Sequence, residues 1–182
     1  SASFAGIYET ILDVRGADAA LDALHRCRAS AGADRVRAYG ARQGLEEGAG
    51  ARIAVVVQRL VRAEAAGVAF SADPVARRRD RSVIEAVPGL GEALVSGHGN
   101  PDRARVDRSG VVVERTSVSG CLPDALAQEV AARAVDLEES LGYPVDVEWA
   151  VEAGRLWLLQ VRPITTSLDD RAPPAPPPAQ MA

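Results

Sequence analysis

Four polar residues near the C-terminal end of the sequence have types and spacings that could do chemistry. Asp146 and Glu148 are two residues apart in the stretch PVDVEWAVEAGRLWLLQVRPI, and Gln160 and Arg162 are two residues apart further along it. Carboxylate and amide oxygens are hard ligands that suit Mg²⁺, and the guanidinium fork of arginine suits phosphate oxygens. The pattern therefore indicates the binding of a magnesium-associated phosphate compound.

The elements that must position these residues are two strands of a predicted β-hairpin. Apolar residues alternate with other residues over 145–151, which is the period of two expected of a strand with unlike faces. Residues 152–154 are predicted to form a three-residue turn in which Gly154 takes a positive φ. Residues 155–162 form the returning strand, and Pro163 ends its ladder.

The register of this hairpin decides whether the polar residues meet. A three-residue turn predicts that Asp146 lies opposite Gln160 and that Glu148 lies opposite Leu158. In that register both carboxylates, the Gln160 amide and the Arg162 guanidinium share one face, whereas a slip of one residue would separate them. Placing these polar side chains on an otherwise apolar face costs free energy unless they bind a ligand. An exposed strand face with a surface ion pair is the alternative interpretation.

The same stretch resembles a known family. The string D-x-E-W-A, a turn and L-x-x-L-Q-x-R-P-I-T is similar to the end of the ATP-binding domain in phosphoenolpyruvate synthase, pyruvate phosphate dikinase and rifampin phosphotransferase. That domain is an ATP-grasp variant, so the resemblance implies an α+β fold with a mostly antiparallel sheet and packed helices. It also implies that Glu148 and Gln160 hold Mg²⁺ and that Arg162 contacts the ATP phosphates, with Asp146 beside them.

The N-terminal segment SFAGIYETILDV, residues 3–14, resembles a family segment of the form S-F-A-G-Q-x-x-T-x-L-x-V. In the family this segment belongs to a loop over the ATP phosphates, which implies a cofactor contact at Gly6. Ile7 stands where the family has glutamine, and this weakens a direct polar role at that position. The R-S-S run that precedes the segment in the family is missing, so we expect the chain to begin inside a nucleotide-binding domain.

A nearly continuous apolar run, RIAVVVQRLV at residues 52–61, predicts a buried strand. Gln58 interrupts the run, and a buried glutamine needs hydrogen-bonding partners. In the family this strand leads into the hinge that binds adenine. The resemblance implies that Gln58 and backbone groups near Arg59 and Leu60 read the edge of the ring. A glutamine on a half-exposed strand is the alternative interpretation.

Two glycine-containing motifs complete the resemblance, which covers roughly residues 1–166. The string GVAFSADP at 67–74 is similar to G-V-x-F-[ST]-x-D-P, a strand that ends in a turn. The string GLGEALVSG at 89–97 is similar to G-L-G-E-x-[LV]-V-x-G, and x-P-D follows it in the family as Asn-Pro-Asp does at 100–102. The glycines either let the backbone approach a ligand closely or simply shape a turn.

Periodicity predicts the remaining elements. A helix is expected over 18–30, capped by Asp18, and a second helix from Asp34 precedes a loop at 44–50. Strands are expected over 82–86 and on either side of Ser109 and Gly110. The clearest helix covers 123–141 and is closed by Gly142. The apolar stripes of the two helices at 18–30 and 123–141 are Leu21, Leu24 and Cys27 in the first, and Leu126, Val130, Ala134, Leu137 and Leu141 in the second.

Composition narrows the function classes. The chain has 182 residues, 47% of them hydrophobic, which is enough for one domain with a sizeable core. A net charge of −4 and a pI near 5.3 argue against nucleic-acid or membrane-surface partners. No apolar run approaches the roughly 20 residues that cross a bilayer. With two cysteines there is no disulfide framework, and we expect a cytoplasmic protein.

The sequence and the resemblance together predict part of a phosphotransferase that is incomplete alone. In the family, ATP donates a phosphoryl group to a histidine on a swivelling domain, and the N-terminal half of the ATP domain supplies a phosphate-binding lysine. All 21 basic residues here are arginine, so that lysine is absent. Residues 1–166 are interpreted as the C-terminal portion of the ATP domain, and residues 167–182 as a Pro/Ala-rich linker. The partners that the resemblance implies are ATP, the missing N-terminal half and a phosphohistidine domain.

Three identities stay open. A phosphoenolpyruvate synthase-like enzyme is the first interpretation. A rifampin phosphotransferase-like ATP domain shares all the motifs named above, because antibiotic specificity would reside in other parts of that enzyme. A stand-alone, non-catalytic nucleotide-binding or regulatory module is the third.

Overall fold

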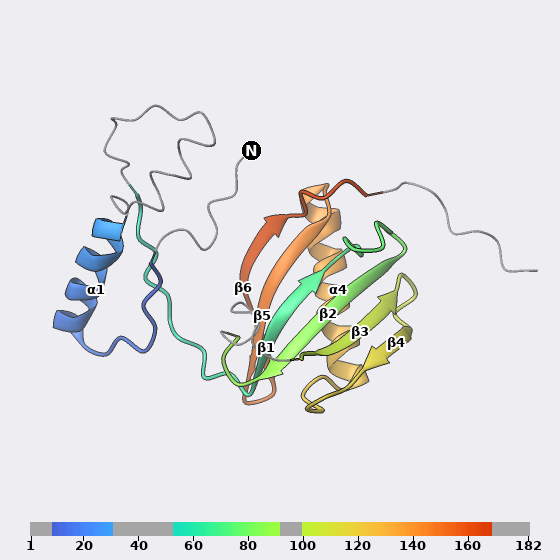
Figure 1. Ribbon diagram of the computed structural model, residues 1–182, viewed down its shortest axis with the longest axis horizontal. Helices are drawn as coiled ribbons and strands as arrows, with labels where there is room; N and C mark the ends of the chain where they lie inside the picture. Colours follow the sequence, from blue (N-terminus) through green and yellow to red (C-terminus); the bar gives the residue numbers. More distant parts are fainter. Residues whose placement is uncertain (1–8, 31–52, 92–99, 169–182) are drawn as a thin grey trace, which may run out of the picture. The chain divides into compact units, whose positions relative to one another are not determined.

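A computed structural model describes residues 9–30, 53–91 and 100–168 of the chain (Figure 1). The chain divides into two compact units, Ser1–Leu60 and Val61–Ala182. Gly6, the helix predicted from Asp34, the loop at 44–50 and the glycine motif beyond Gly91 lie outside the described residues. Over the ranges that are described, no helix has both the length and the apolar character needed to cross a membrane.

The first unit contains the predicted N-terminal helix as α1, Ala17–Ala29. The prediction that Asp18 caps it is wrong, because Gly16 is the N-cap and no side chain bonds to the exposed amides. Gly16 has φ 86°, a left-handed conformation that favours glycine, and this lets the helix start one residue earlier. Leu21, assigned to the apolar stripe, is 57% exposed, so that part of the stripe is also wrong.

The strand predicted over 52–61 is not formed in the described part of that range. Residues 53–61 have no strand conformation, and Val56 and Val57 are 81% and 77% exposed. Gln58 is exposed rather than buried. The physical reason is that an apolar run predicts burial but a strand also needs a neighbouring strand for its backbone. No described strand lies beside this run in the pairing of the sheet.

The second unit contains a six-stranded antiparallel sheet with strand order β4-β3-β2-β1-β5-β6 (Figure 1). Its elements are β1 Ala65–Phe70, β2 Arg81–Pro88, β3 Asp102–Asp107, β4 Val112–Thr116, α4 Asp124–Leu141, β5 Val145–Glu152 and β6 Arg155–Pro163. The prediction of an α+β fold with a mostly antiparallel sheet is confirmed. The strands predicted around residues 67–70, 82–86 and 103–118 and the C-terminal hairpin are confirmed with it.

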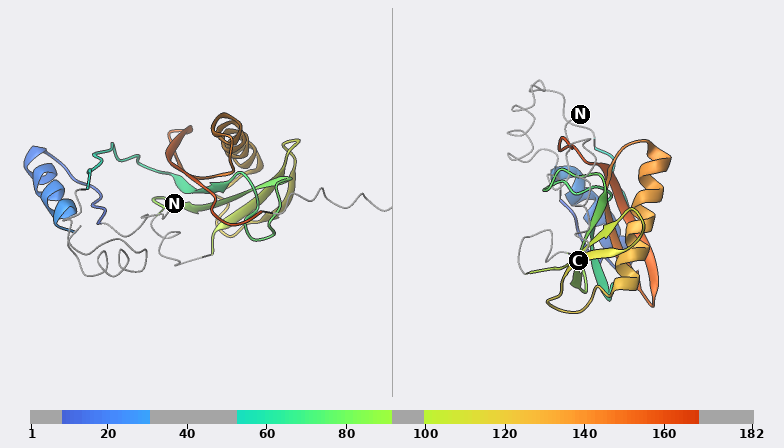
Figure 2. Two further views of the ribbon diagram at one scale, coloured as in Figure 1. Left: turned by 90° about the horizontal axis from the view of Figure 1, so that it is seen from above. Right: turned by 90° about the vertical axis from the view of Figure 1, so that its right-hand side faces the viewer.

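Helix α4 covers one face of this sheet and forms the core with it (Figure 2). Alternate strand residues point toward the helix, as the period of two requires. The fully buried residues of this core include Ala69, Ile84, Ala104, Val106, Ala127, Val130, Ala134, Val145, Val147 and Trp149. The intervening residues face the other way, and we call the surface they form, opposite α4, the polar face.

The ends of α4 follow the predicted signals closely. Pro123 is the N-cap, and Gly142 closes the helix in the left-handed conformation with φ 79°. Four of the five predicted stripe residues pack on the core: Val130 and Ala134 are buried, and Leu126 and Leu137 are partly buried. The helix also buries Ala127 and Ala131. Leu141 is 44% exposed, so its assignment to the core is wrong. It lies in the last turn of the helix, where residues 139–142 are all exposed.

Gly67 allows β1 and β2 to approach each other. A Cβ at this position would lie 1.8 Å from the Glu85 carbonyl oxygen of β2, so the backbone of one strand would have to move. We expect Gly67→Ala to destabilise the chain by about 1–3 kcal/mol, measured by urea unfolding. Gly91→Ala is the matched control, because its Cβ would meet only the Ala66 methyl at 3.6 Å. Equal costs for the two variants would contradict the prediction.

Candidate functional site

The hairpin of β5 and β6 closes with a turn of two residues. Ala153 and Gly154 form the turn, and Glu152 pairs with Arg155. Both turn residues have positive φ, 52° and 71°, as a type I′ turn requires. The predicted three-residue turn over 152–154 is therefore wrong. The physical reason is that the twist of a type I′ turn matches the twist of the two strands, so the shorter connection is favoured.

A one-residue bulge in β6 sets which side chains lie opposite the carboxylates. Trp149 pairs with Leu158, but Glu148 pairs with Gln160, so Leu159 has no partner across the ladder. Leu159 packs instead against a small apolar cluster on the polar face. Without the bulge, the two-residue turn would place Leu159 opposite Glu148 and turn Gln160 toward the helix.

The four polar residues share one face of the sheet, as predicted, but in a different register. Asp146 lies opposite Arg162, and Glu148 lies opposite Gln160. The predicted partners, Gln160 for Asp146 and Leu158 for Glu148, are wrong. The shared face is retained because the two-residue turn and the bulge together shift the pairing by two residues relative to the predicted register, and a shift of two preserves the side of every side chain.

Asp146 is a buried carboxylate with one oxygen paired. Its residue is 8% exposed, and Arg162 donates from Nε to Oδ2 at 2.7 Å. The other oxygen, Oδ1, is buried and accepts no hydrogen bond from the residues that the structure describes. Because burial of an unpartnered carboxylate oxygen is costly, a cation or a hydrogen-bond donor bound at Oδ1 would stabilise this arrangement.

Glu148 and Gln160 present oxygens beside this carboxylate. Glu148 is half-buried and Gln160 is exposed. Neither side chain has a hydrogen bond or ion pair within the described ranges, in contrast to Asp146. Both are therefore available to a ligand on the polar face.

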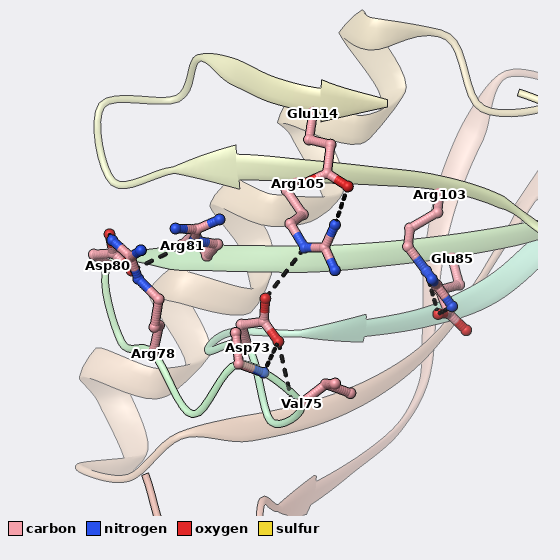
Figure 3. Close-up of polar contacts among 10 residues, drawn as sticks. Asp73, Val75, Arg78, Asp80, Arg81, Glu85, Arg103, Arg105 and Glu114 are labelled. Atoms are coloured by element: carbon pink, nitrogen blue, oxygen red, sulfur yellow. Dashed lines mark hydrogen bonds and ion pairs between the residues drawn. The ribbon is translucent and has the colours of Figure 1, made fainter. Parts of the chain in front are cut away.

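The β2–β3–β4 half of the polar face carries arginines that are already paired with carboxylates. Arg103 donates from Nε to Glu85 at 2.7 Å, and Arg105 binds both Asp73 and Glu114 (Figure 3). Burial alone would lower the pKa of the Arg105 guanidinium, but its hydrogen bonds to the two carboxylates raise that pKa above its ordinary value. These pairs neutralise this half of the face.

Asp73 organises the turn that leaves β1, where the sequence predicts turn chemistry. Its Oδ1 accepts hydrogen bonds from the amides of Val75 and Ala76 at 3.1 and 2.8 Å, and its Oδ2 accepts one from Arg105 at 3.2 Å (Figure 3). Its backbone exchanges two hydrogen bonds with Arg78. Asp73 thus joins the turn to the polar face.

The three residues predicted to contact adenine lie in the first unit, in a groove of their own. Gln58, Arg59 and Leu60 line this groove together with α1 and residues 9–14. Most of its lining residues are of apolar types, among them Leu12 and Leu24. The structure thus places the three residues together on one groove and leaves their predicted role as a prediction.

The sequence does not predict the structural roles of two buried polar residues that hold the second unit together. Ser71 hydrogen-bonds the start of β5, and Asp102 accepts hydrogen bonds from the loop before α4. Both belong to motif strings that the sequence does reveal, at 67–74 and 100–102. Their roles stay hidden because the bonds reach residues 16 to 74 positions away.

Comparison with known proteins identifies the family of the chain. The family described as pyruvate phosphate dikinase, AMP/ATP-binding domain, matches residues 1–120 and 110–181. A probable phosphoenolpyruvate synthase of Pyrococcus abyssi is 36% identical over 91% of the chain and 24% of its own length. A rifampicin phosphotransferase of Streptomyces sviceus is 39% identical over 91% of the chain and 22% of its own length.

A third relative is named for a different activity. The prodigiosin synthesizing transferase PigC of Serratia marcescens is 36% identical over 90% of the chain and 21% of its own length. The chain thus spans about a quarter or less of the length of these relatives. The resemblance read from the motifs is confirmed over nearly the whole chain, and the chain belongs to the family of pyruvate phosphate dikinase AMP/ATP-binding domains.

Proposed function

We propose that the polar residues of the β5–β6 hairpin bind Mg²⁺ and the phosphates of ATP in a phosphoenolpyruvate synthase-like phosphotransferase. In this proposal residues 1–166 are the C-terminal portion of an ATP-grasp-like domain, and residues 167–182 are a linker. Family membership supports ATP as the ligand. The observation that carries the metal and phosphate assignment is the buried, unpartnered Oδ1 of Asp146, which shares its face with Glu148 and Gln160.

The donor set fits Mg²⁺. Glu148, Gln160 and Asp146 offer hard oxygen atoms, and Mg²⁺ is commonly held by one or two carboxylates together with substrate phosphates and water. Within the described ranges no group of three or more His, Cys, Asp or Glu side chains is arranged so that it could hold a metal ion by itself. The remaining ligands would then be phosphate oxygens and water. When bound, Mg²⁺ would supply neutralisation of the negative charge on the phosphoryl oxygens.

Arg162 would contact the phosphates directly. Its Nε is bound to Asp146, which fixes the plane of the guanidinium. Its two terminal nitrogens have no hydrogen bond within the described residues, and its side chain is 39% exposed. A guanidinium that is oriented in this way offers charge-assisted hydrogen bonds to phosphate oxygens. Its positive charge would stabilise the charge that spreads over the phosphoryl oxygens during transfer.

The rest of the ATP contact belongs to the same proposal and depends on the family likeness. Gln58 and the backbone near Arg59 and Leu60 would read the adenine edge, and Gly6 would lie near the phosphates. The phosphoryl group would pass from ATP to a histidine on a separate swivelling domain. The chain would need the N-terminal half of the ATP domain and that histidine domain for activity.

The final acceptor of the phosphoryl group would lie in another part of the enzyme. We propose pyruvate as the acceptor, as the names of the Pyrococcus relatives suggest. A rifamycin acceptor is the second candidate, favoured by the 39% identity to the Streptomyces rifampicin phosphotransferase.

Substitution of Glu148 tests the metal assignment. We expect Glu148→Ala to weaken Mg²⁺-dependent ATP binding at least about tenfold, because a charged oxygen ligand is lost. The measurement is calorimetric titration of the chain with ATP at several Mg²⁺ concentrations. Glu129→Ala, which removes an exposed carboxylate on α4, is the matched control. Equal binding by wild type and Glu148→Ala would contradict the assignment.

Phosphohistidine formation separates the enzyme from a non-catalytic module. The chain would be mixed with the N-terminal half of the ATP domain and the histidine domain of a phosphoenolpyruvate synthase relative. Transfer of the label from γ-³²P-labelled ATP to histidine would support the phosphotransferase function, provided that the transfer is lost in Glu148→Ala. Tight ATP binding with no label transfer in any mixture would favour the module.

A further inference from the structure

The first residue of β5 is held by a serine side chain from beyond β1. The Val145 amide donates to the Ser71 Oγ at 2.9 Å, and the Ser71 amide donates to the Val145 carbonyl at 2.9 Å. Both residues are fully buried. The two bonds extend the β1–β5 ladder one residue past its last pair, Phe70 with Asp146.

The hydroxyl at this point replaces a backbone carbonyl. In a regular antiparallel pair two opposite residues exchange both N–H···O=C bonds, so the Val145 amide would bond to the Ser71 carbonyl. Here that carbonyl instead accepts a hydrogen bond from the Ser82 hydroxyl of β2 at 3.3 Å. The chain is therefore able to leave the ladder for the turn at Asp73 while the start of β5 keeps its bond.

We propose that Ser71 is a positioning residue for Asp146, the buried carboxylate of the metal and phosphate site. The inference rests on the function proposed above. Asp146 directly follows Val145, so a shift of the Val145 backbone moves the carboxylate. Through the 2.7 Å bond between Asp146 Oδ2 and Arg162 Nε, the same shift would move the guanidinium. Ser71 thus acts on the site without touching a ligand.

Three variants of one side chain test this role, with one control. Ser71→Ala leaves the Val145 amide without its acceptor and is expected to raise the Mg²⁺ concentration that half-saturates ATP binding about tenfold. Ser71→Thr keeps the hydroxyl and is expected to restore most of that loss. Ser71→Cys keeps a weak acceptor and should lie between the two. Ser82→Ala, which removes only the 3.3 Å bond to the Ser71 carbonyl, is the control and should change the Mg²⁺ requirement least.

A second measurement does not depend on any ligand. The Nε–H resonance of Arg162 in an ¹⁵N spectrum of the free chain reports its hydrogen bond to Asp146. Ser71→Ala and Ser71→Cys are expected to shift or broaden that signal, and Ser71→Thr and Ser82→Ala to leave it in place. If Ser71→Ala fails to fold, the Arg162 signal of Ser71→Cys is compared with that of the wild type instead.

The outcomes separate the inference from the proposed function. A moved Arg162 signal with a raised Mg²⁺ requirement, both restored in Ser71→Thr, supports the positioning role. An unmoved Arg162 signal in Ser71→Cys or Ser71→Ala overturns it, whatever the binding result. If wild type shows no Mg²⁺-dependent ATP binding, the proposed function fails, and the Arg162 signal alone decides whether Ser71 positions Asp146.

Discussion

Arg162→Ala is expected to lower the affinity of the chain for Mg-ATP by at least about a hundredfold, because it removes the charge that we assign to the phosphates. It should also lower the free energy of unfolding by about 2 kcal/mol, since it leaves the buried Asp146 carboxylate without its partner. We set this cost below that of a fully buried pair because the arginine side chain is 39% exposed. Calorimetric titration and urea unfolding measure the two effects.

The double variant Asp146→Ala with Arg162→Ala separates stability from binding. Removing both partners takes away the stranded charge, so the double variant should be more stable than Arg162→Ala alone. Its affinity for Mg-ATP should stay low, because neither the phosphate contact nor the carboxylate returns. Arg103→Ala, which breaks the more exposed pair with Glu85, is the matched control for an arginine on the same face. If the double variant recovered its affinity for Mg-ATP together with its stability, the phosphate role of Arg162 would be contradicted.

Asp102→Ala is expected to cost about 3 kcal/mol of unfolding free energy, more than any other single carboxylate substitution that we predict. Asp102 is 1% exposed and accepts hydrogen bonds from the amides of Val118, Ser119 and Leu122 and from the Ser119 hydroxyl. These bonds fix the loop that leads into α4, so their loss would loosen the core on that side of the sheet. Urea unfolding measures the cost.

Asp107→Ala is the matched control for this substitution. Asp107 also accepts hydrogen bonds from two amides and a hydroxyl, but it does so in the solvent-facing turn between β3 and β4. Water can replace its bonds when the carboxylate is removed, so we expect a cost of about 1 kcal/mol. A cost for Asp107→Ala as large as that for Asp102→Ala would show that burial does not set the difference.

Asp102 is also expected to make the stability of the folded chain depend on pH in the acid range. Burial alone would raise the pKa of this carboxyl, but the three amides and the Ser119 hydroxyl lower it, from the ordinary 3.8 to about 2. Because the folded pKa lies below the unfolded value, the stabilisation is complete above about pH 4 and is lost as the pH falls toward 2. The lowered pKa corresponds to roughly 2 kcal/mol of stabilisation at neutral pH. Acid unfolding of wild type and Asp102→Asn, followed by circular dichroism, checks this loss, which the variant should lack.

The sequence predicts those parts of the fold that depend on local pattern. The alternation of apolar and polar residues predicts β5, and Pro123 and Gly142 predict the two ends of α4. Both predictions hold because tertiary contacts do not override these local backbone preferences. The run at 53–61 shows the limit of such patterns, because its valines predict a strand while pairing depends on a partner. Pattern predicts which segments are apolar, and packing decides what they contact.

The sequence predicts which face of the sheet carries the candidate site, but it does not predict which residues pair across the two strands. Alternation places Asp146 and Glu148 on one side of β5 whatever the register. Their partners in β6 depend on the turn length and on the bulge at Leu159, and no local signal in the sequence marks that bulge. The unpartnered Oδ1 of Asp146 and the Ser71 bond depend on contacts between distant segments, which no local pattern in the sequence encodes.

The bulge at Leu159 has a consequence for how this hairpin can change in length during evolution. Inserting or deleting a single residue between Trp149 and Gln160 would carry Val161 to the ligand side and turn the Gln160 amide and the Arg162 guanidinium toward α4. Gains and losses of two residues would leave every side chain on its own side. Homologous hairpins of different length should therefore differ by even numbers of residues, or carry a second irregularity that compensates for an odd one.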